Sequence, residues 1–270
     1  MKKRKFFKVV AAVLAAAFAV PFFSACGKVG DESNDEELET VAIGSDEYAP
    51  YFYRDEDGEF AGIDVELAKE ACKRIGKKAV FTKIEWSRKD VLIDSGEIEC
   101  LWGCFSMTGR EDLYAWAGPY MKSRQVLAVR ENSGIYKFSD LAGKSVAVQA
   151  TSKADELLSS GKDERIPPLG HIYCFTDFEH IFAALKNGYA DAVAGHETAL
   201  RESMKNNTGE YRILEETLLS VNLGAAFKKG GGENLARLIS DALKVMKNDG
   251  FIAKALRKYG IDYETVAEGL

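Results

Sequence analysis

Apolar residues along the chain fall alternately into short unbroken runs and into runs with helical spacing. TVAIGS, residues 40–45, predicts a buried strand, and AVFTKIEW, residues 79–86, predicts another. Between them, apolar residues recur at helical spacing from Val65 to Ile75, and Gly76 stands where a left-handed helix end belongs. This part of the chain therefore predicts a strand, a helix and a strand in succession.

The same alternation returns in the second half of the chain. DLAGKSVAVQATSKADELL, residues 140–158, predicts a turn, a strand and a helix that begins near Thr151 or Ser152. TDFEHIFAALKNG, residues 176–188, predicts a helix that opens with a capping box between its first and fourth residues. His180 lies off the apolar stripe of that helix and is predicted to be on the surface. Strands that alternate with helices indicate parallel α/β sheets. The predicted core stripe consists of Phe178, Ile181, Phe182 and Leu185.

Two segments of the chain share one layout. SGEIECLWGC, residues 95–104, and NGYADAVAGH, residues 187–196, each contain a helix end, a glycine, an acidic residue, an apolar strand and a polar loop. Two equivalent halves would each deliver a loop from the carboxyl end of a strand, where open α/β sheets bind ligands. The alternative is coincidence, because units of helix, glycine and strand are common.

The length of 270 residues favours two domains, and the amino-terminal end predicts export. A basic stretch, residues 2–5, precedes an apolar run, residues 9–23, that is too short for a comfortable membrane span, so residues 1–25 are predicted to be a signal peptide. FSAC, which ends at Cys26, resembles a bacterial lipobox, although Phe23 stands where a smaller aliphatic residue is usual. Lipid on Cys26 would anchor the protein to the membrane. Simple secretion with a free Cys26 is the alternative.

Composition narrows the possible partners. Residues 26–39 are acidic, with few large apolar side chains, and are predicted to be a flexible tether. The signal peptide carries five basic residues and no acids, so its removal takes the net charge from −6 to −11. This acidic charge argues against nucleic acid or anionic lipid as a partner.

The cysteines predict no metal site. The chain has no CxxC pair and only three histidines, so we expect neither a zinc site nor another cofactor. Cys72 in a helical pattern and Cys100 in a strand pattern are predicted to be small buried hydrophobes. The spacing does not identify a disulfide.

Several motifs together resemble the family 3 extracellular solute-binding proteins, the polar-amino-acid receptors of ABC importers. The resemblance runs from about Thr40 to Tyr259, nearly all of the chain after the tether. Its markers are GSDEYAPYFYRDEDGEFAGIDVELAKEACKRIG, the EW before a helix that ends in SGEIE, GREDLYAWAGPYMKSRQVLAVRENS, LAGKSVAVQATS and MKNDGFIAKALRKYG.

The resemblance implies an α/β protein with the two-lobed, periplasmic-binding-protein-like (type II) fold. Each lobe is a mostly parallel sheet flanked by helices, and two crossover strands near residues 125–129 and 220–226 form the hinge. The ligand lies in the cleft between the lobes. The implied bounds are residues 40–126 and 223–265 for lobe one and residues 127–222 for lobe two.

The resemblance also carries over site positions in lobe one. Tyr48 and Trp86 match the aromatic walls on both sides of the ligand side chain, where flat rings cover an apolar or cationic stem. Core packing is the alternative for Trp86. Asp46 matches an acid that often contacts the distal end of the ligand.

The loop CFSMTGRED, residues 104–112, matches the part of lobe one that holds the ligand backbone. Cys104 and Ser106 match positions that contact this backbone. Arg110 matches the arginine that clamps the α-carboxylate, since guanidinium and carboxylate pair through two parallel hydrogen bonds. The loop is one residue shorter than the usual pattern between Thr108 and Arg110, so its geometry is expected to differ.

In lobe two, the resemblance implies a strand-to-helix turn and one position that departs from the family. The backbone N–H groups of a helix start can bind an anion. His196 aligns with the family's aspartate for the ligand α-amino group, and Glu197 follows it. We expect Glu197 to supply the missing carboxylate; the alternative is a ligand without an ordinary α-ammonium group. The residues that match the turn are Gln149, Thr151, Ser152 and Lys153.

These observations predict an extracytoplasmic receptor, anchored by lipid, that binds a small carboxylate-bearing solute and delivers it to an ABC permease. An amino acid is the expected solute, a monomer is the expected form, and no enzymatic activity is expected. Two alternatives stay open. One is an enzyme similar to cyclohexadienyl dehydratases, with His196 and Glu197 in acid–base roles. The other is a sensory receptor, which could bind a carboxylate that lacks an α-amino group.

Overall fold

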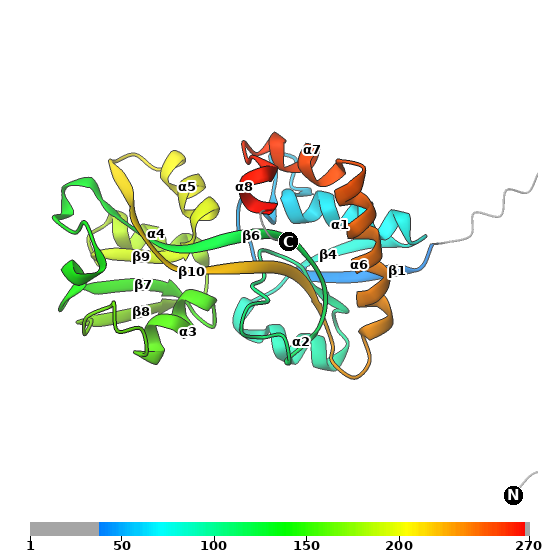
Figure 1. Ribbon diagram of the computed structural model, residues 1–270, viewed down its shortest axis with the longest axis horizontal. Helices are drawn as coiled ribbons and strands as arrows, with labels where there is room; N and C mark the ends of the chain where they lie inside the picture. Colours follow the sequence, from blue (N-terminus) through cyan, green and yellow to red (C-terminus); the bar gives the residue numbers. More distant parts are fainter. Residues whose placement is uncertain (1–37, 268–270) are drawn as a thin grey trace, which may run out of the picture. The chain divides into compact units, whose positions relative to one another are not determined.

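The computed structural model of the chain describes residues 38–267 (Figure 1). The predicted signal peptide, Cys26 and nearly all of the predicted tether lie outside the described residues. No helix among residues 38–267 is long and apolar enough to cross a membrane.

Eight strands form one mixed sheet in the order β4-β1-β5-β10-β6-β9-β7-β8, and β2 (Tyr53–Arg54) pairs with β3 (Phe60–Ala61) in a separate hairpin. Strands β4, β1 and β5 are parallel to one another, and so are β9, β7 and β8. Antiparallel pairing joins β5 to β10, β10 to β6 and β6 to β9. The bounds are β1 Thr40–Ser45, β4 Lys78–Lys83, β5 Cys100–Leu101, β6 Ala115–Arg130, β7 Ser145–Gln149, β8 His171–Phe175, β9 Ala192–His196 and β10 Tyr211–Phe227.

Helices flank the two parallel parts of the sheet and divide the described residues into two lobes (Figure 1). One lobe contains β1, β4 and β5 with α1, α2, α6, α7 and α8; the other contains β7, β8 and β9 with α3, α4 and α5. The bounds are α1 Ile63–Arg74, α2 Lys89–Ser95, α3 Lys153–Ser160, α4 Phe178–Lys186, α5 Glu197–Lys205, α6 Glu233–Asn248, α7 Phe251–Lys258 and α8 Tyr263–Ala267, with short 3-10 turns at Trp86–Arg88, Glu131–Ser133 and Phe138–Leu141.

The two long central strands, β6 and β10, run through both lobes and contain the two predicted crossover segments. Their ladder extends from Tyr211, opposite Arg130, to Phe227, opposite Ala115. Its register shifts at three places, one of them between Leu223 and Ala225. Such irregularities interrupt the ladder and let a strand bend.

The hydrophobic pattern placed most elements correctly. Strand β1 has the predicted bounds, Cys72 and Cys100 are buried, and Gly76 has a left-handed φ of 72° after α1. The second predicted strand is shorter than its apolar run, because β4 ends at Lys83 and a 3-10 turn begins at Trp86.

The core stripe predicted for residues 176–188 is buried in α4, and His180 is exposed, as predicted. The capping box, in contrast, is wrong. The N-cap of α4 is Asp177, not Thr176, and no side chain caps this helix start. Thr176 lies one residue before the N-cap, and its hydroxyl donates to the Asp177 carboxylate at 2.9 Å.

The shared layout of residues 95–104 and 187–196 reflects equivalent architecture. Gly96 and Gly188 both follow helices and both have left-handed φ angles, 79° and 76°. The next strands pair alike: β5 is parallel to β1 and antiparallel to the long strand β10, and β9 is parallel to β7 and antiparallel to the long strand β6. The strand order therefore reads the same from either edge of the sheet.

Gly62, at the start of α1, is predicted to be intolerant of any side chain. It has a φ of 125°, and an added Cβ would lie 2.2 Å from the backbone oxygen of Tyr51. We expect Gly62→Ala to lower the free energy of unfolding by about 2–4 kcal/mol, because strain and a clash with backbone combine. Urea denaturation measures this loss. The matched control is Gly58→Ala: Gly58 has a φ of 81° but no atom within 4 Å of the added Cβ, so about 1 kcal/mol is expected. Equal losses in the two variants would contradict the argument.

Candidate ligand-binding cleft

One cleft collects residues from the carboxyl ends of strands in both lobes. Its walls follow β1, β4 and β5 on one side and β7 and β9 on the other. This is the edge at which open α/β sheets bind ligands. The cavity volume is about 30 Å³, far below the roughly 300–1,000 Å³ of pockets that hold a small-molecule ligand. The lining residues are Asp46, Tyr48, Trp86, Gly103, Cys104, Phe105, Ser106, Arg110, Gln149, Ser152, Lys153 and His196.

The structure brings together ten of the twelve residues predicted to bind ligand and leaves two outside the lining. Thr151 lies directly behind the wall: its hydroxyl accepts a hydrogen bond from Lys89 Nζ at 3.0 Å, and its carbonyl accepts one from Arg110 at 3.5 Å. Glu197 begins α5 and faces away from the lining.

Arg110 is buried and reaches across the cleft. Its guanidinium donates to the Ser106 carbonyl in its own lobe at 3.4 Å and lies 5.3 Å from the centre of the Phe105 ring. From the other lobe, Glu156 Oε2 lies 3.1 Å from Arg110 Nη2. The Glu156 side chain is 51% exposed, so this carboxylate is largely hydrated while the guanidinium is not. Arg110 therefore offers a buried positive charge without a buried carboxylate partner.

Two lysines add positive charge to the same region. Lys153, at the start of α3, is buried, and its ammonium contacts both oxygens of Glu156 at 2.9 and 2.8 Å. Lys89 lies 5.3 Å from the centre of the Trp86 ring, and burial lowers its pKa. The N-cap of α3 is Ser152, whose hydroxyl accepts from the Asp155 amide at 3.2 Å. This end of the cleft suits an anion.

Asp46 gives the cleft lining a carboxylate. Gln149 Nε2, from the other lobe, donates to Asp46 Oδ2 at 2.6 Å. Burial raises the pKa of Asp46 to about 6, and the hydrogen bond from Gln149 opposes that rise. Asp46 is consequently mostly ionised at neutral pH, with a neutral amide as its direct partner.

The two predicted aromatic walls have different neighbours. The Tyr48 ring lies 4.2 Å from the Phe178 ring of the other lobe, and its hydroxyl accepts a hydrogen bond from the His196 amide at 3.3 Å. Trp86 packs edge-on against Phe105, with 4.9 Å between the ring centres, within a hydrophobic cluster. Trp86 thus serves core packing and lines the cleft at once, so the two interpretations of this residue are compatible.

His196 ends β9 and is buried in a network of polar side chains. Its Nε2 lies 2.8 Å from Gln125 Nε2 and 3.3 Å from Ser106 Oγ, and its Nδ1 lies 2.9 Å from Ser123 Oγ. Burial, together with the smaller effect of the Arg110 charge, lowers the pKa of His196 to about 3. The imidazole is therefore neutral at physiological pH.

Glu197 is engaged on the outer side of the second lobe. Its Oε2 accepts from Arg124 Nε at 2.6 Å, and its Oε1 accepts from Arg201 Nε at 2.9 Å. These two arginines and the hydrogen bonds they donate lower the pKa of Glu197 against the opposing effect of its burial. Both carboxylate oxygens thus have charged partners that hold the side chain away from the cleft.

The loop after β5 is positioned by a buried acid that the sequence did not single out. Cys104 has a positive φ of 52°, and its amide donates to Asp64 Oδ2 at 2.6 Å. Next to it, Gly103 approaches Ser45 so closely that a Cβ would lie 1.7 Å from the Ser45 hydroxyl. The backbone that carries Cys104 and Ser106 is therefore fixed by contacts within the core of its lobe.

Other residues missed by sequence reasoning support or line the cleft. Gly103 and Phe105 belong to the lining, while Ser123 and Gln125 stand behind His196. The sequence offered only a weak signal for the last two, the polar stretch SRQ; the structure shows that Ser123 and Gln125 are buried in β6 and that Arg124 between them is exposed. Two buried polar residues at strand spacing indicate a polar network.

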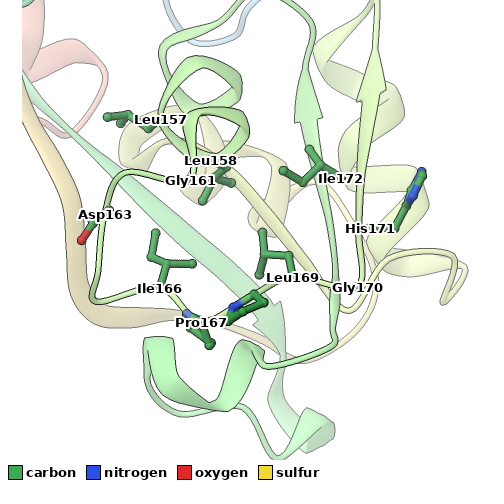
Figure 2. A pocket seen from close by; sticks show the side chains of 11 residues that line it. Leu157, Leu158, Gly161, Asp163, Ile166, Pro167, Leu169, Gly170, His171 and Ile172 are labelled. Carbon is green, nitrogen blue, oxygen red and sulfur yellow. The ribbon is translucent and has the colours of Figure 1, made fainter.

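A second cavity, of about 550 Å³, lies between the end of α3, the loop that follows it and β8 (Figure 2). Figure 2 shows Ile166, Leu169 and Ile172 around it. Its acid, Asp163, forms an ion pair with Arg165 at 2.6 Å. This cavity is mainly aliphatic, and none of the predicted site residues lines it. Among the described residues, no group of three or more His, Cys, Asp or Glu side chains could hold a metal ion.

Two lobes on a shared sheet, with a polar cleft at the carboxyl ends of their strands, define the class of two-lobed solute-binding proteins. The comparisons with known proteins agree. Residues 41–262 match the family model of the bacterial extracellular solute-binding proteins, family 3, and the chain belongs to that family.

The relatives are amino-acid-binding proteins. The chain is 27% identical to the L-cystine-binding protein TcyA of Bacillus subtilis (strain 168), an alignment that covers 78% of this chain and 77% of the relative. It is 25% identical to the ABC transporter glutamine-binding protein GlnH of the same organism, over 93% and 97% of the two chains. Among solved structures, an ancestral arginine-binding protein bound to glutamine is 28% identical, with a TM-score of 0.73 over 82% of this chain and 97% of that one.

Asp64 is predicted to make stability depend on pH. Burial raises its pKa from 3.8 to about 7, against the effect of the hydrogen bond from Cys104. Between these values the folded protein holds a proton that the unfolded chain releases, so the free energy of unfolding falls as the pH rises. Thermal unfolding should show Asp64→Asn removing about 2–3 kcal/mol of the decline between pH 5 and pH 8. The amide can still accept from Cys104, so the loop is retained. An unchanged decline in the variant would show that Asp64 is not its source.

Proposed function

We propose that the protein is an extracytoplasmic receptor for a small carboxylate-bearing solute, an amino acid, which it binds between its lobes and delivers to an ABC importer. The observation that carries this proposal is Arg110: a buried guanidinium in the cleft, whose carboxylate partner within the protein, Glu156, is half exposed. A solute carboxylate could replace Glu156 there and form two parallel hydrogen bonds with the guanidinium. The amino-acid-binding relatives support the class of solute.

Binding requires the lobes to separate and close. A space of about 30 Å³ cannot hold an amino acid, and direct contacts cross it, among them Asp46 to Gln149 and Lys89 to Thr151. A solute enters when these contacts open and is enclosed when the lobes return. The free energy of the solute's contacts with both lobes then favours the closed form. We assign residues 40–126 and 223–265 to the first lobe and residues 127–222 to the second, with β6 and β10 as the hinge.

A receptor on the outer face of the membrane also requires an export signal and a membrane anchor. We propose that residues 1–25 direct export, that lipid on Cys26 holds the protein at the membrane, and that residues 26–39 form the tether. The permease would recognise the closed form. The enzymatic alternative receives less support, because a pKa of about 3 makes His196 a weak base and both of its ring nitrogens are already hydrogen-bonded.

Arg110→Ala is predicted to abolish most of the affinity for the solute. Removal of one partner from a buried charge pair costs about 2–5 kcal/mol, so the dissociation constant should rise by roughly 30-fold to several thousand-fold. Native mass spectrometry of freshly purified protein would identify a co-purified solute by its mass, and calorimetry with that solute measures the loss. The matched control is Arg237→Ala on α6, an arginine that is 63% exposed and remote from the cleft lining. Unchanged affinity in Arg110→Ala would refute the carboxylate clamp.

Cys26→Ser is predicted to release the protein from the membrane. The intact mass of the wild-type membrane fraction should show an acylated amino-terminal cysteine, because stable anchoring needs more than one acyl chain. Cys174→Ser, which removes an exposed thiol elsewhere, is the control and should leave anchoring unchanged. A Cys26→Ser protein that stays in the membrane fraction and carries lipid at another residue would contradict the lipobox interpretation.

A further inference from the structure

His196 gives the cleft an uncharged wall whose hydrogen-bonding capacity is already used. The amide nitrogen of Gln125 can only donate, so Nε2 of His196 accepts and Nδ1 carries the proton that is donated to Ser123. Turning the Gln125 amide exchanges these roles: Nε2 then donates to the amide oxygen, and Nδ1 accepts from the Ser123 hydroxyl. In either arrangement the ring keeps no free lone pair for an ammonium group of the ligand.

The electrostatic surroundings of His196 also disfavour an ammonium group. Ser106 links His196 to Arg110: its hydroxyl lies 3.3 Å from His196 Nε2, and its carbonyl accepts a hydrogen bond from the Arg110 guanidinium. The charge of Arg110 acts on the imidazole and, together with burial, keeps it neutral. An ammonium at this place would meet the same positive charge. The nearest acid in sequence, Glu197, has both oxygens engaged by Arg124 and Arg201.

The cleft nevertheless has one place for a cation. Asp46 is the only carboxylate among the residues that line it, and it is buried. Its hydrogen-bond partner from the facing lobe is the neutral amide of Gln149, which does not neutralise its charge. Tyr48 and Trp86 line the same cleft and can cover an apolar stem that leads to a cationic group. The lining thus contains two cationic residues, Arg110 and Lys153, and one anionic residue, Asp46. The neutral imidazole of His196 lies beside Arg110, on the other side of Ser106.

We propose that the ligand is an ω-amino acid or ω-guanidino acid: its carboxylate binds Arg110, the carbon beside the carboxylate carries no ammonium and faces His196, and its distal cation binds Asp46. This inference rests on the proposed function, because it takes the carboxylate at Arg110 as given. It departs from our expectation that Glu197 would supply a carboxylate for an α-ammonium group. A buried ammonium without a negative partner is costly, so α-amino acids of the same length should bind more weakly.

Three matched pairs of compounds test the proposal by calorimetry on the purified full chain. They are lysine with ε-aminocaproate, ornithine with δ-aminovalerate, and arginine with δ-guanidinovalerate; the members of each pair differ only in the α-amino group. At least one compound without the α-amino group should bind about tenfold or more tightly than its partner, because the unpaired ammonium costs more than 1.4 kcal/mol. The plain carboxylates valerate and caproate should bind at least about tenfold more weakly than the ω-amino acids, because they leave Asp46 unpaired.

Two variants assign the selectivity to its residues. His196→Asp should reverse the preference within the pair, since it places a carboxylate beside the α-ammonium position. If that buried variant fails to fold, Asp46→Asn provides an independent test: it should weaken the ω-amino acid and remove its advantage over caproate or valerate, because no buried charge is then left unpaired by the plain carboxylates. The control is His180→Ala, an exposed histidine on α4, which should keep the wild-type preference.

Four results would overturn the proposal. One is tighter binding of the α-amino acid in all three pairs. Another is that Glu197→Gln no longer binds the compound that the wild-type protein binds most tightly. A third is equal binding of caproate and ε-aminocaproate. The fourth is that none of the three pairs binds while another carboxylate does, in which case the proposed function stands and this inference fails. If no carboxylate of any kind binds, the proposed function itself fails.

Discussion

The antiparallel ladder between β6 and β10 is the constraint on which the cleft depends. β5 joins this ladder at Ala226 and Phe227, near the end of β10, whereas β9 joins β6 at residues 125–129, nearer its other end. The two strands also run in opposite directions, because β5 is antiparallel to β10 and β9 is antiparallel to β6. Their carboxyl ends therefore converge, and each brings the neighbouring parallel strands with it. Asp46 after β1 and Gln149 at the end of β7 come within hydrogen-bond distance for this reason.

The buried charged side chains of the cleft are only partly neutralised, because their partners are either exposed to water or uncharged. Arg110 and Lys153 are buried but share Glu156, a carboxylate that remains half exposed to water. Asp46 is buried and receives only a neutral amide, which leaves its pKa raised to about 6. Fully paired buried charges would need no ligand, whereas partly paired ones gain most when a complementary group replaces water or a hydrated side chain. The incomplete pairing is consistent with a site that exchanges its partners.

Rigid backbone holds these side chains in place at some cost in stability. Asp64 is buried to fix the amide of Cys104, and its pKa of about 7 means that its charge is unfavourable in the folded protein at neutral pH. Gly103 can carry no side chain, because Ser45 occupies the space. Proteins commonly accept such local costs at functional sites. Here the cost lies one layer behind the lining, in the core of the first lobe.

The sequence alone determined the alternation of strands and helices, the likeness of residues 95–104 and 187–196, and most of the residues that line the cleft. These features depend on local periodicity and on motifs that can be recognised in the sequence without knowledge of the fold. The sequence could not assign the helix start at Asp177, because Thr176 and Asp177 are both residue types that commonly begin a helix. It also gave no weight to Asp64, Ser123 or Gln125, whose partners lie far away along the chain.

Only the tertiary structure decided where the side chains of His196 and Glu197 lie. The two residues are adjacent in sequence, but the change from strand β9 to helix α5 turns one into the cleft and the other toward Arg124 and Arg201. Residue type alone made the glutamate the natural partner for an ammonium group. Its position is set by the direction in which the helix begins and by arginines on β6 and α5, and no local pattern contains that information.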